Sequence, residues 1–150
     1  MTTPPIAIRP LAPQDKAAWA PLWRAYQNFY EVDLADVTDL TFARLTDPAE
    51  PMHGALAWQG EAVVGFVHYL THRSTWSAAD VCYLQDLYVS PDGRGAGVGR
   101  TLIDHVYAQA DAHGWGEVYW LTHETNTTAR RLYDTLAERT GFLHYMRPVK

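Results

Sequence analysis

The sequence contains one cysteine, Cys82, among its 150 residues, so no disulfide can form within the chain. Because Cys82 stands in an apolar run, we expect it to be buried and unreactive. No run of Lys or Arg stands out and the formal net charge is −5, which argues against nucleic acid as a partner. No window approaches the roughly 18 apolar residues of a membrane span, and the N-terminus carries no basic segment followed by an apolar stretch. These absences predict a cytoplasmic protein with no membrane partner.

What is present is the composition of an ordinary globular protein, with 47% hydrophobic and 19% charged residues. The length suits one domain over residues 1–150, with no internal repeat or linker. An acidic surface would weakly favour the approach of a cationic small molecule.

Periodicity predicts an alternation of strands and helices. A short edge strand is expected at 6–11, because Pro10 cannot donate to a central strand. Aromatic and apolar residues at helical spacing predict a helix at 14–31, kinked or divided at Pro21, and a short helix around 39–46. Further strands are expected at 54–59, 62–72, 81–90, 118–122 (buried) and 142–146, with helices at 97–112 and 126–139. The order predicts an α/β (α+β) fold.

A glycine-rich segment lies between the strand at 81–90 and the following helix. Gly93, Gly95, Gly97 and Gly99 alternate with larger residues, and glycine lets a backbone approach a ligand closely. The N-terminus of a helix offers unpaired N–H groups and partial positive charge to an anion. With Arg94 and Arg100 nearby, the segment is typical of a diphosphate site.

Three interpretations other than a diphosphate site apply to this loop. A flexible turn without a ligand stays open for the glycine pattern alone. A P-loop requires Gly-Lys-Ser/Thr, whereas Gly99 is followed by Arg100 and Thr101. A dinucleotide fingerprint fails at Val98, and the all-parallel context that it needs is missing.

Arg94-Gly95-Ala96-Gly97-Val98-Gly99 resembles the Arg/Gln-x-x-Gly-x-Gly/Ala signature of the GNAT family of N-acetyltransferases. Residues 83–89 (Tyr-Leu-Gln-Asp-Leu-Tyr-Val) look like the central strand of that family, and Asn126, Ala129 and Tyr133 like its second cofactor motif. The likeness covers roughly residues 6–146 and is strongest from 83 to 145. It points to the branch with polyamine and histone-type enzymes, carried by residues 119–134.

The resemblance implies the GNAT fold, a mixed and mostly antiparallel sheet that splays between its fourth and fifth strands and is flanked by helices. It implies acetyl-CoA as the donor. Backbone amides from Arg94 through Thr101, in the stretch Arg94, Gly95, Ala96, Gly97, Val98, Gly99, Arg100 and Thr101, would bind the pyrophosphate. The pantetheine arm would pair with Leu87, Tyr88 and Val89 as an added strand.

The resemblance also gives roles to the late helix. Asn126 would hydrogen-bond the cofactor arm, and Ala129 would keep the helix close to it. Tyr133 follows Asn126 by seven residues, two helical turns, so both side chains share a face. Its phenol would protonate the leaving thiolate as general acid, the alternative being a core tyrosine.

The base that deprotonates the acceptor amine is left open. Relatives often have Leu-Glu-Asp where this chain has Leu84-Gln85-Asp86, and Gln85 cannot take a proton. Asp86, expected on the opposite face of the strand from Gln85, would bind an ammonium group, act as base through water, or be purely structural. Glu124 and His123 are weaker candidates, and an external base is a further alternative.

Tyr26, Tyr30 and Glu31 lie where the first helices of the family cover the acceptor pocket, and we expect them, with Gln85 and Asp86, to bind the substrate. His68 and His72 are interpreted as surface or pocket polar residues, and no metal is expected.

The leading hypothesis is transfer of an acetyl group to a primary amine of a small cationic acceptor, polyamine-like, an amino acid or a lysine side chain. Gln85 keeps a second hypothesis open, a non-catalytic acyl-CoA-binding regulatory module. A third is an anion-binding structural protein. The aromatic strand expected at 142–146 has an edge that could pair with another chain, and the resemblance implies dimerisation through this end. Together they predict a homodimer.

Overall fold

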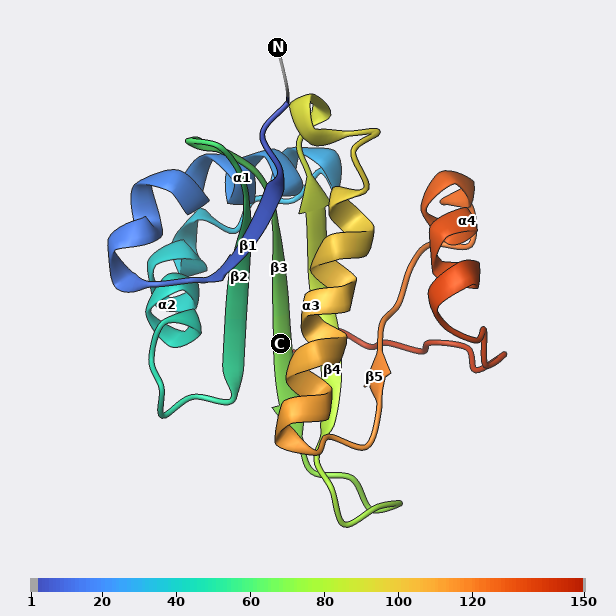
Figure 1. The fold of residues 1–150 in the computed structure, drawn as a ribbon. Helices are drawn as coiled ribbons and strands as arrows, with labels where there is room; N and C mark the ends of the chain where they lie inside the picture. The colour runs from blue at the N-terminus through green and yellow to red at the C-terminus, as the bar shows by residue number, and fades with distance from the viewer. Residues whose placement is uncertain (1–2, 150) are drawn as a thin grey trace. The chain divides into compact units, whose positions relative to one another are not determined.

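A five-stranded sheet with the strand order β1-β2-β3-β4-β5 organises the computed structural model, which describes residues 3–149 (Figure 1). The strands are β1 (Ile6–Pro10), β2 (Met52–Gln59), β3 (Ala62–His72), β4 (Val81–Val89) and β5 (Val118–Tyr119). The first three pairings are antiparallel and β4–β5 is parallel. The predicted mixed and mostly antiparallel sheet is confirmed, and β1 lies at its edge as Pro10 required.

Helices α1 (Lys16–Phe29) and α2 (Ala35–Leu45) cover one face of this sheet (Figure 1). Their apolar side chains pack with Leu56 of β2 and Phe66 of β3 in one hydrophobic cluster. A short 3-10 turn, η1 (Pro13–Asp15), precedes α1. Pro21 lies inside α1 without dividing it. Pro21 has no backbone N–H to donate, but it is exposed, and the helix continues past it.

Helix α3 (Val98–His113) covers the opposite face of the sheet. Its buried stripe is Val98, Leu102, Ile103, Val106 and Ala110. Gly65 of β3 makes the close approach possible: a Cβ at this position would lie 2.7 Å from the Tyr88 carbonyl oxygen and 3.2 Å from Val98. Glycines in the left-handed conformation bound the helix, Gly97 (φ 73°) before it and Gly114 (φ 71°) after it.

The chain divides into two compact units, Met1–Trp120, which holds the sheet and the first three helices, and Leu121–Lys150. The second unit contains α4 (Thr127–Leu136). Between residues 137 and 149 no strand forms, so the strand predicted at 142–146 is wrong. Alternating aromatic residues met the local preference of a strand, but a strand also needs a neighbour to pair with, and these side chains are exposed.

The strand predicted at 118–122 is shorter than expected. β5 is only Val118–Tyr119, and both residues are half-buried rather than buried.

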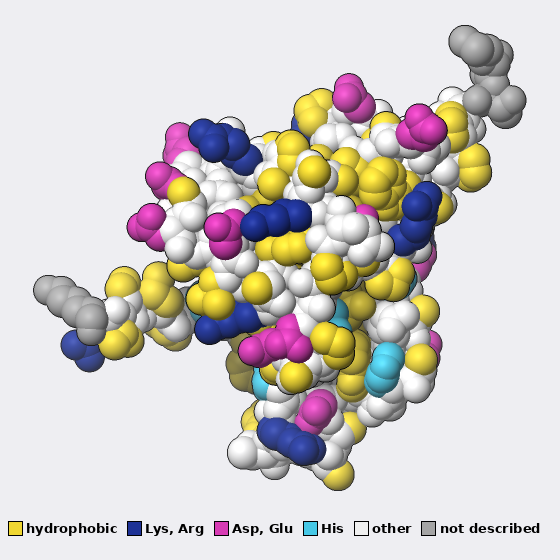
Figure 2. Space-filling view, turned by 90° about the vertical axis from the view of Figure 1, so that its left-hand side faces the viewer, with side chains coloured by type: hydrophobic (Ala, Val, Ile, Leu, Met, Phe, Trp, Pro, Cys, Tyr) yellow, Lys and Arg dark blue, Asp and Glu magenta, His cyan; other side chains and the backbone are white. Residues whose placement is uncertain are grey.

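Lys and Arg side chains stand singly among Asp and Glu side chains on the face that carries α1 and α2 (Figure 2). None of the helices formed by residues 3–149 is both long and apolar enough to cross a membrane.

Candidate active site

Strand β4 carries the centre of the site, because it loses its neighbour halfway along. It pairs with β5 only at Cys82↔Val118 and Tyr83↔Tyr119. From Leu84 to Val89 the same edge of β4 has no strand partner among the described residues. Leu87, Tyr88 and Val89, the predicted partners of the cofactor arm, are half-buried along this free edge. An extended group could add to such an edge by backbone hydrogen bonds.

The glycine-rich loop follows β4 directly, through the 3-10 turn η2 (Pro91–Gly93). Gly95 (φ 85°) and Gly97 (φ 73°) adopt the left-handed conformation, and a Cβ at either would find no atom within 4 Å. The loop therefore presents bare backbone to open space. Arg94 lies here too, its Nε donating to the Val89 carbonyl at 3.4 Å.

The start of α3 completes this anion cradle. The first N–H groups of a helix, here those of Val98, Gly99 and Arg100, have no partner inside the helix. Thr101 donates its backbone N–H and its hydroxyl to the Gly97 carbonyl, at 3.0 and 2.9 Å, and so fixes the first turn. The Val98 side chain is buried, so only its backbone can meet a ligand. The loop fits the diphosphate of a CoA molecule by free donors and open space.

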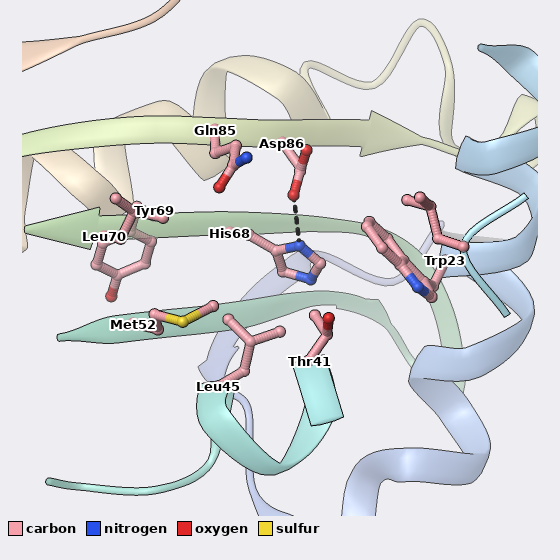
Figure 3. Close-up of a pocket in the computed structure, with 10 residues that line it drawn as sticks. Trp23, Thr41, Leu45, Met52, His68, Tyr69, Leu70, Gln85 and Asp86 are labelled. Atoms are coloured by element: carbon pink, nitrogen blue, oxygen red, sulfur yellow. Dashed lines mark hydrogen bonds and ion pairs between the residues drawn. The ribbon is translucent and has the colours of Figure 1, made fainter. Parts of the chain in front are cut away.

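An irregularity in β4 shapes the acceptor side. The pairing with β3 passes from His68↔Asp86 to Tyr69↔Leu84, so Gln85 has no cross-strand partner. This β-bulge breaks the alternation of a regular strand. Gln85 and Asp86 both line one cavity, and Figure 3 draws them on the same side of β4. The expectation that they point to opposite faces is therefore wrong.

The cavity beside this bulge has a volume of about 180 Å³. Its walls come from α1, α2 and strands β2, β3 and β4 (Figure 3). The lining side chains are mostly apolar or aromatic, with Asp86 as the single carboxylate: Trp23, Leu34, Thr41, Leu45, Met52, His68, Tyr69, Leu70, Gln85 and Asp86. A cavity of this kind would hold a small molecule that is apolar over most of its surface and positively charged at one end.

Asp86 is held by two side chains. His68 Nδ1 lies 2.9 Å from Asp86 Oδ2, and the Tyr26 hydroxyl donates to Oδ1 at 2.6 Å. His68 in turn accepts a 2.9 Å hydrogen bond on Nε2 from the indole N–H of Trp19. Burial first, and then the negative charge of Asp86, raise the pKa of Tyr26 well above its ordinary value. Tyr26 therefore stays a protonated donor to the carboxylate.

The other predicted acceptor residues are placed unequally. Tyr30 packs on Tyr26 with ring centroids 4.9 Å apart, and burial followed by the Asp86 charge raises its pKa. Glu31 is exposed in the turn after α1 and is not among the residues lining the cavity. The geometry thus brings Tyr26, Gln85 and Asp86 together, with Tyr30 beside them.

The second predicted cofactor motif lies in the second unit. Asn126 caps α4 and donates from Nδ2 to the Thr122 hydroxyl at 3.3 Å. Ala129 and Tyr133 are half-buried on α4, as Asn126 is, whereas Glu124 and His123 are exposed. No cluster of three or more His, Cys, Asp or Glu side chains that could hold a metal ion occurs within residues 3–149.

Sequence reasoning missed the role of His68 and Trp19. His68 is only 3% exposed. Its position in the sequence was the available signal. His68 lies an even number of residues from Val64 and Phe66 in an apolar strand, so all three side chains point to the same face, the core face. Its partner Trp19 is 49 residues away in the chain, and no local pattern indicates that contact.

A sheet that opens beside β4, a glycine loop leading into a helix, and a cavity at the bulge together define an acyl-CoA-dependent transferase. The sequence model of the acetyltransferase (GNAT) family matches residues 18–137. The chain belongs to this family and is an N-acetyltransferase with acetyl-CoA as donor.

Two relatives and one solved structure place it more closely. The chain is 41% identical to the D-amino-acid N-acetyltransferase HPA3 of Saccharomyces cerevisiae, over 95% of this chain and 90% of the relative. It is 35% identical to a Bos taurus thialysine N-epsilon-acetyltransferase, over 61% of this chain and 49% of that protein. The aminoglycoside acetyltransferase AAC(6')-Iy, solved with a bisubstrate analogue, shares the fold with a TM-score of 0.83 and 19% identity, over 97% of this chain and 99% of its own.

Proposed function

We propose that the acceptor is the primary amine of a small amino acid-like molecule, whose ammonium group binds at Asp86. The observation that carries this proposal is the single carboxylate of Asp86 on the wall of a mostly apolar cavity. An ammonium ion is its natural complement, because the two charges attract most strongly where water is partly excluded. Of the three kinds of acceptor expected from the sequence, a polyamine, an amino acid or a lysine side chain, this proposal keeps the amino acid.

The lining favours an acceptor with one positive charge over a polyamine. A polyamine carries several positive charges, and the cavity offers one carboxylate to meet them. Its apolar walls, including Leu45 and Met52, suit an uncharged apolar side chain. The similarity to a D-amino-acid N-acetyltransferase supports the same choice. Amino acids of both hands therefore belong in the test.

On the donor side, acetyl-CoA supplies the acetyl thioester when bound. The amides between Arg94 and Thr101, whose own N–H groups already bond Pro91 and Gly97, would hold its diphosphate. The open edge at residues 87–89 would pair with its arm. Asn126 would hydrogen-bond the same arm. The positive charges of Arg94 and Arg100 would add to the electrostatic attraction between the N-terminus of α3 and the diphosphate.

The transfer needs three proton movements, which we assign to two residues of the chain. Asp86 takes the first proton, from the acceptor ammonium, so that the nitrogen lone pair can form the new C–N bond, and later releases it to solvent. As the C–S bond breaks, Tyr133 donates its phenolic proton to the leaving sulfur, and the second proton that the acylated nitrogen loses restores the phenol. Gln85 lines the cavity beside Asp86 and carries no group that could take either proton.

An acceptor screen that follows thiol release tests the proposal. D- and L-amino acids with apolar side chains should release thiol fastest, ahead of spermidine and lysine peptides. Asp86→Asn should lower kcat/KM for the best acceptor at least about a hundredfold and leave the KM for acetyl-CoA little changed.

The matched control is Asp39→Asn, which removes an exposed carboxylate paired only with Lys16 on the surface. It should behave as the wild type does. Preference for spermidine would overturn the choice of acceptor. An Asp86→Asn variant of undiminished kcat/KM would overturn the site itself.

We also propose a homodimer that buries the C-terminal segment 142–146. Phe142 and Tyr145 of this segment are 82% and 88% exposed, and clustered exposed apolar groups mark association surfaces. The partner in this proposal is a second copy of the chain. Light scattering should give the dimer mass for the wild type and the monomer mass for Phe142→Ser/Tyr145→Ser, and a monomeric wild type would contradict it.

A further inference from the structure

We propose that Trp19 and His68 are positioning residues that hold the Asp86 carboxylate without a cation beside it, so that its negative charge is available to the acceptor. This inference rests on the acceptor site proposed above. Three hydrogen bonds in series, from Trp19 to His68, from His68 to Asp86 and from Tyr26 to Asp86, carry it.

The first step is the protonation state of His68. The indole N–H of Trp19 is a donor and has no lone pair to offer. His68 Nε2, 2.9 Å from it, must therefore accept and carries no proton. The ring proton of a neutral histidine then lies on Nδ1, which donates to Asp86 Oδ2 at 2.9 Å. The network selects one tautomer and one charge state.

The second step is what this does to Asp86. One oxygen accepts from His68 and the other from Tyr26, and both donors are neutral. Hydrogen bonds donated to a carboxylate favour its charged form. The Asp86 side chain is 14% exposed, so it keeps some access to the cavity. Neither of these two donors offsets the charge of Asp86 with a charge of its own.

The third step is the state that Trp19 excludes. A protonated His68 would put an N–H on Nε2 against the Trp19 N–H, two donors 2.9 Å apart in a buried place. It would also place a positive charge beside Asp86 and repel an incoming ammonium group. The Trp19 N–H therefore disfavours a charged ion pair between His68 and Asp86.

Among the described residues, the other titratable groups that line the cavity or lie beside Asp86 are phenols, including that of Tyr69 on β3. From α1 come the phenols of Tyr26 and Tyr30, and from β4 the phenol of Tyr83 beside Asp86; burial and the Asp86 charge raise the pKa of all three. Helix α2 and strand β2 add only uncharged residues to the shared cavity, among them Thr41 and Met52.

The test is the pH profile of Trp19→Phe, expressed as the ratio of its acceptor kcat/KM to that of the wild type between about pH 5.5 and 8.5. The ratio cancels the titration of the amine itself. Without the indole N–H, His68 can take up a proton, so the ratio should be flat above neutrality. It should fall about tenfold further towards pH 5.5, because a protonated His68 would offset the negative charge of Asp86. The KM for acetyl-CoA should not follow this profile.

Two variants separate the proton from the packing. Trp23→Phe removes an equally buried indole of the same helix, whose N–H donates to Thr38 instead; its ratio should not depend on pH. In Trp19→Phe/His68→Asn, the asparagine can still donate to Asp86 but cannot be protonated. The double variant should lose the fall at low pH.

A flat ratio for a folded Trp19→Phe overturns the inference. Should that variant fail to fold, the wild type itself decides: long-range proton–nitrogen NMR, assigned with His68→Asn, should show the Nδ1–H tautomer of His68 unchanged from about pH 8.5 to 5.5. A doubly protonated ring in that range would overturn it equally.

The two proposals fail separately. If Asp86→Asn keeps full acceptor kcat/KM, the acceptor site falls and this inference falls with it. If Asp86→Asn is impaired while the Trp19→Phe ratio stays flat, the site stands and only the role of Trp19 and His68 is withdrawn.

Discussion

Asp86 concentrates the charge of the acceptor cavity in one side chain. His68 and Tyr26 hold its two oxygens from different elements, β3 and α1. A carboxylate fixed in this way cannot turn to follow a misplaced substrate, so orientation is set before the acceptor arrives. Because the Asp86 carboxylate is already oriented, little further conformational entropy is lost at this residue when the acceptor binds.

Tyr133→Phe should separate chemistry from binding. The phenylalanine keeps the aromatic ring on α4 and removes the proton that we assign to the leaving sulfur, so kcat should fall about a hundredfold or more. Calorimetric binding of CoA should be unchanged within about twofold, because only one hydroxyl is lost.

Tyr145→Phe is the matched control, since it removes an exposed phenol from the same unit. Its kcat should stay at the wild-type level. Equal losses of kcat and CoA affinity in Tyr133→Phe would contradict a role as general acid.

At the scale of single residues, sequence reasoning found what local patterns encode. The glycine loop at 94–99 and the carboxylate of Asp86 were both indicated by neighbouring residues. The bond between Trp19 and His68 was not, because it joins α1 to β3 across 49 positions. The bulge at Gln85 was also missed, since nothing in Leu84-Gln85-Asp86 distinguishes an extra residue from a regular one.

At the scale of elements, the two ends of α3 share the same backbone conformation, but only its N-terminal end is expected to bind the cofactor. Gly97 and Gly114 both have positive φ, and a Cβ at either would contact nothing within 4 Å. Alanine at either position should therefore destabilise the protein by about 1 kcal/mol through backbone strain alone. Urea unfolding should give similar losses for Gly97→Ala and Gly114→Ala.

Only Gly97→Ala should also raise the KM for acetyl-CoA, because its Cβ would enter the space where the backbone meets the diphosphate. Gly114→Ala serves as the control for strain without a binding site. An unchanged KM in Gly97→Ala would show that the donor does not approach the loop closely there.

The elements that sequence reasoning predicted well are those with a strong period or clear stops. Helix α3 was expected at 97–112 and runs from Val98 to His113. The strands expected at 54–59 and 62–72 formed as β2 and β3, an antiparallel pair joined through Gly60 at φ 64°. Predictions failed at 118–122 and 142–146, where a strand depends on a partner that the local sequence does not specify.

For the whole molecule, a group of histidines should make stability depend on pH. His53 stacks on Tyr69 with ring centroids 5.2 Å apart, and burial, then the charge of His113, lower its pKa. Burial also lowers the pKa of His105, whose Nε2 is buried without a hydrogen-bond partner. Both are thus harder to protonate in the folded protein than in the unfolded chain.

The sign follows from proton uptake. Below about pH 6.5 the unfolded chain binds protons that the folded protein refuses, so the free energy of unfolding should fall as the pH falls, by at most about 1.4 kcal/mol per pH unit for each histidine. Above that pH both states are neutral at these positions and the effect vanishes. Urea unfolding between about pH 7.5 and 5.5 measures the slope.

His105→Phe should reduce this slope and keep stability near neutrality, because the ring is retained and the unpaired nitrogen is gone. His123→Phe, at an exposed position outside segment 142–146, is the control and should leave the slope unchanged. A His105→Phe slope equal to that of the wild type would contradict the assignment.

The bulge at Gln85 has a consequence for how the enzyme could diverge. Gln85 lines the cavity and is paired with no residue across the sheet, so its replacement disturbs no register. The neighbouring Asp86 is tied to two other side chains and is not free in this sense. Substitution at position 85 can therefore change the size and polarity of the cavity wall while Asp86 and the pairing of β3 with β4 stay constant.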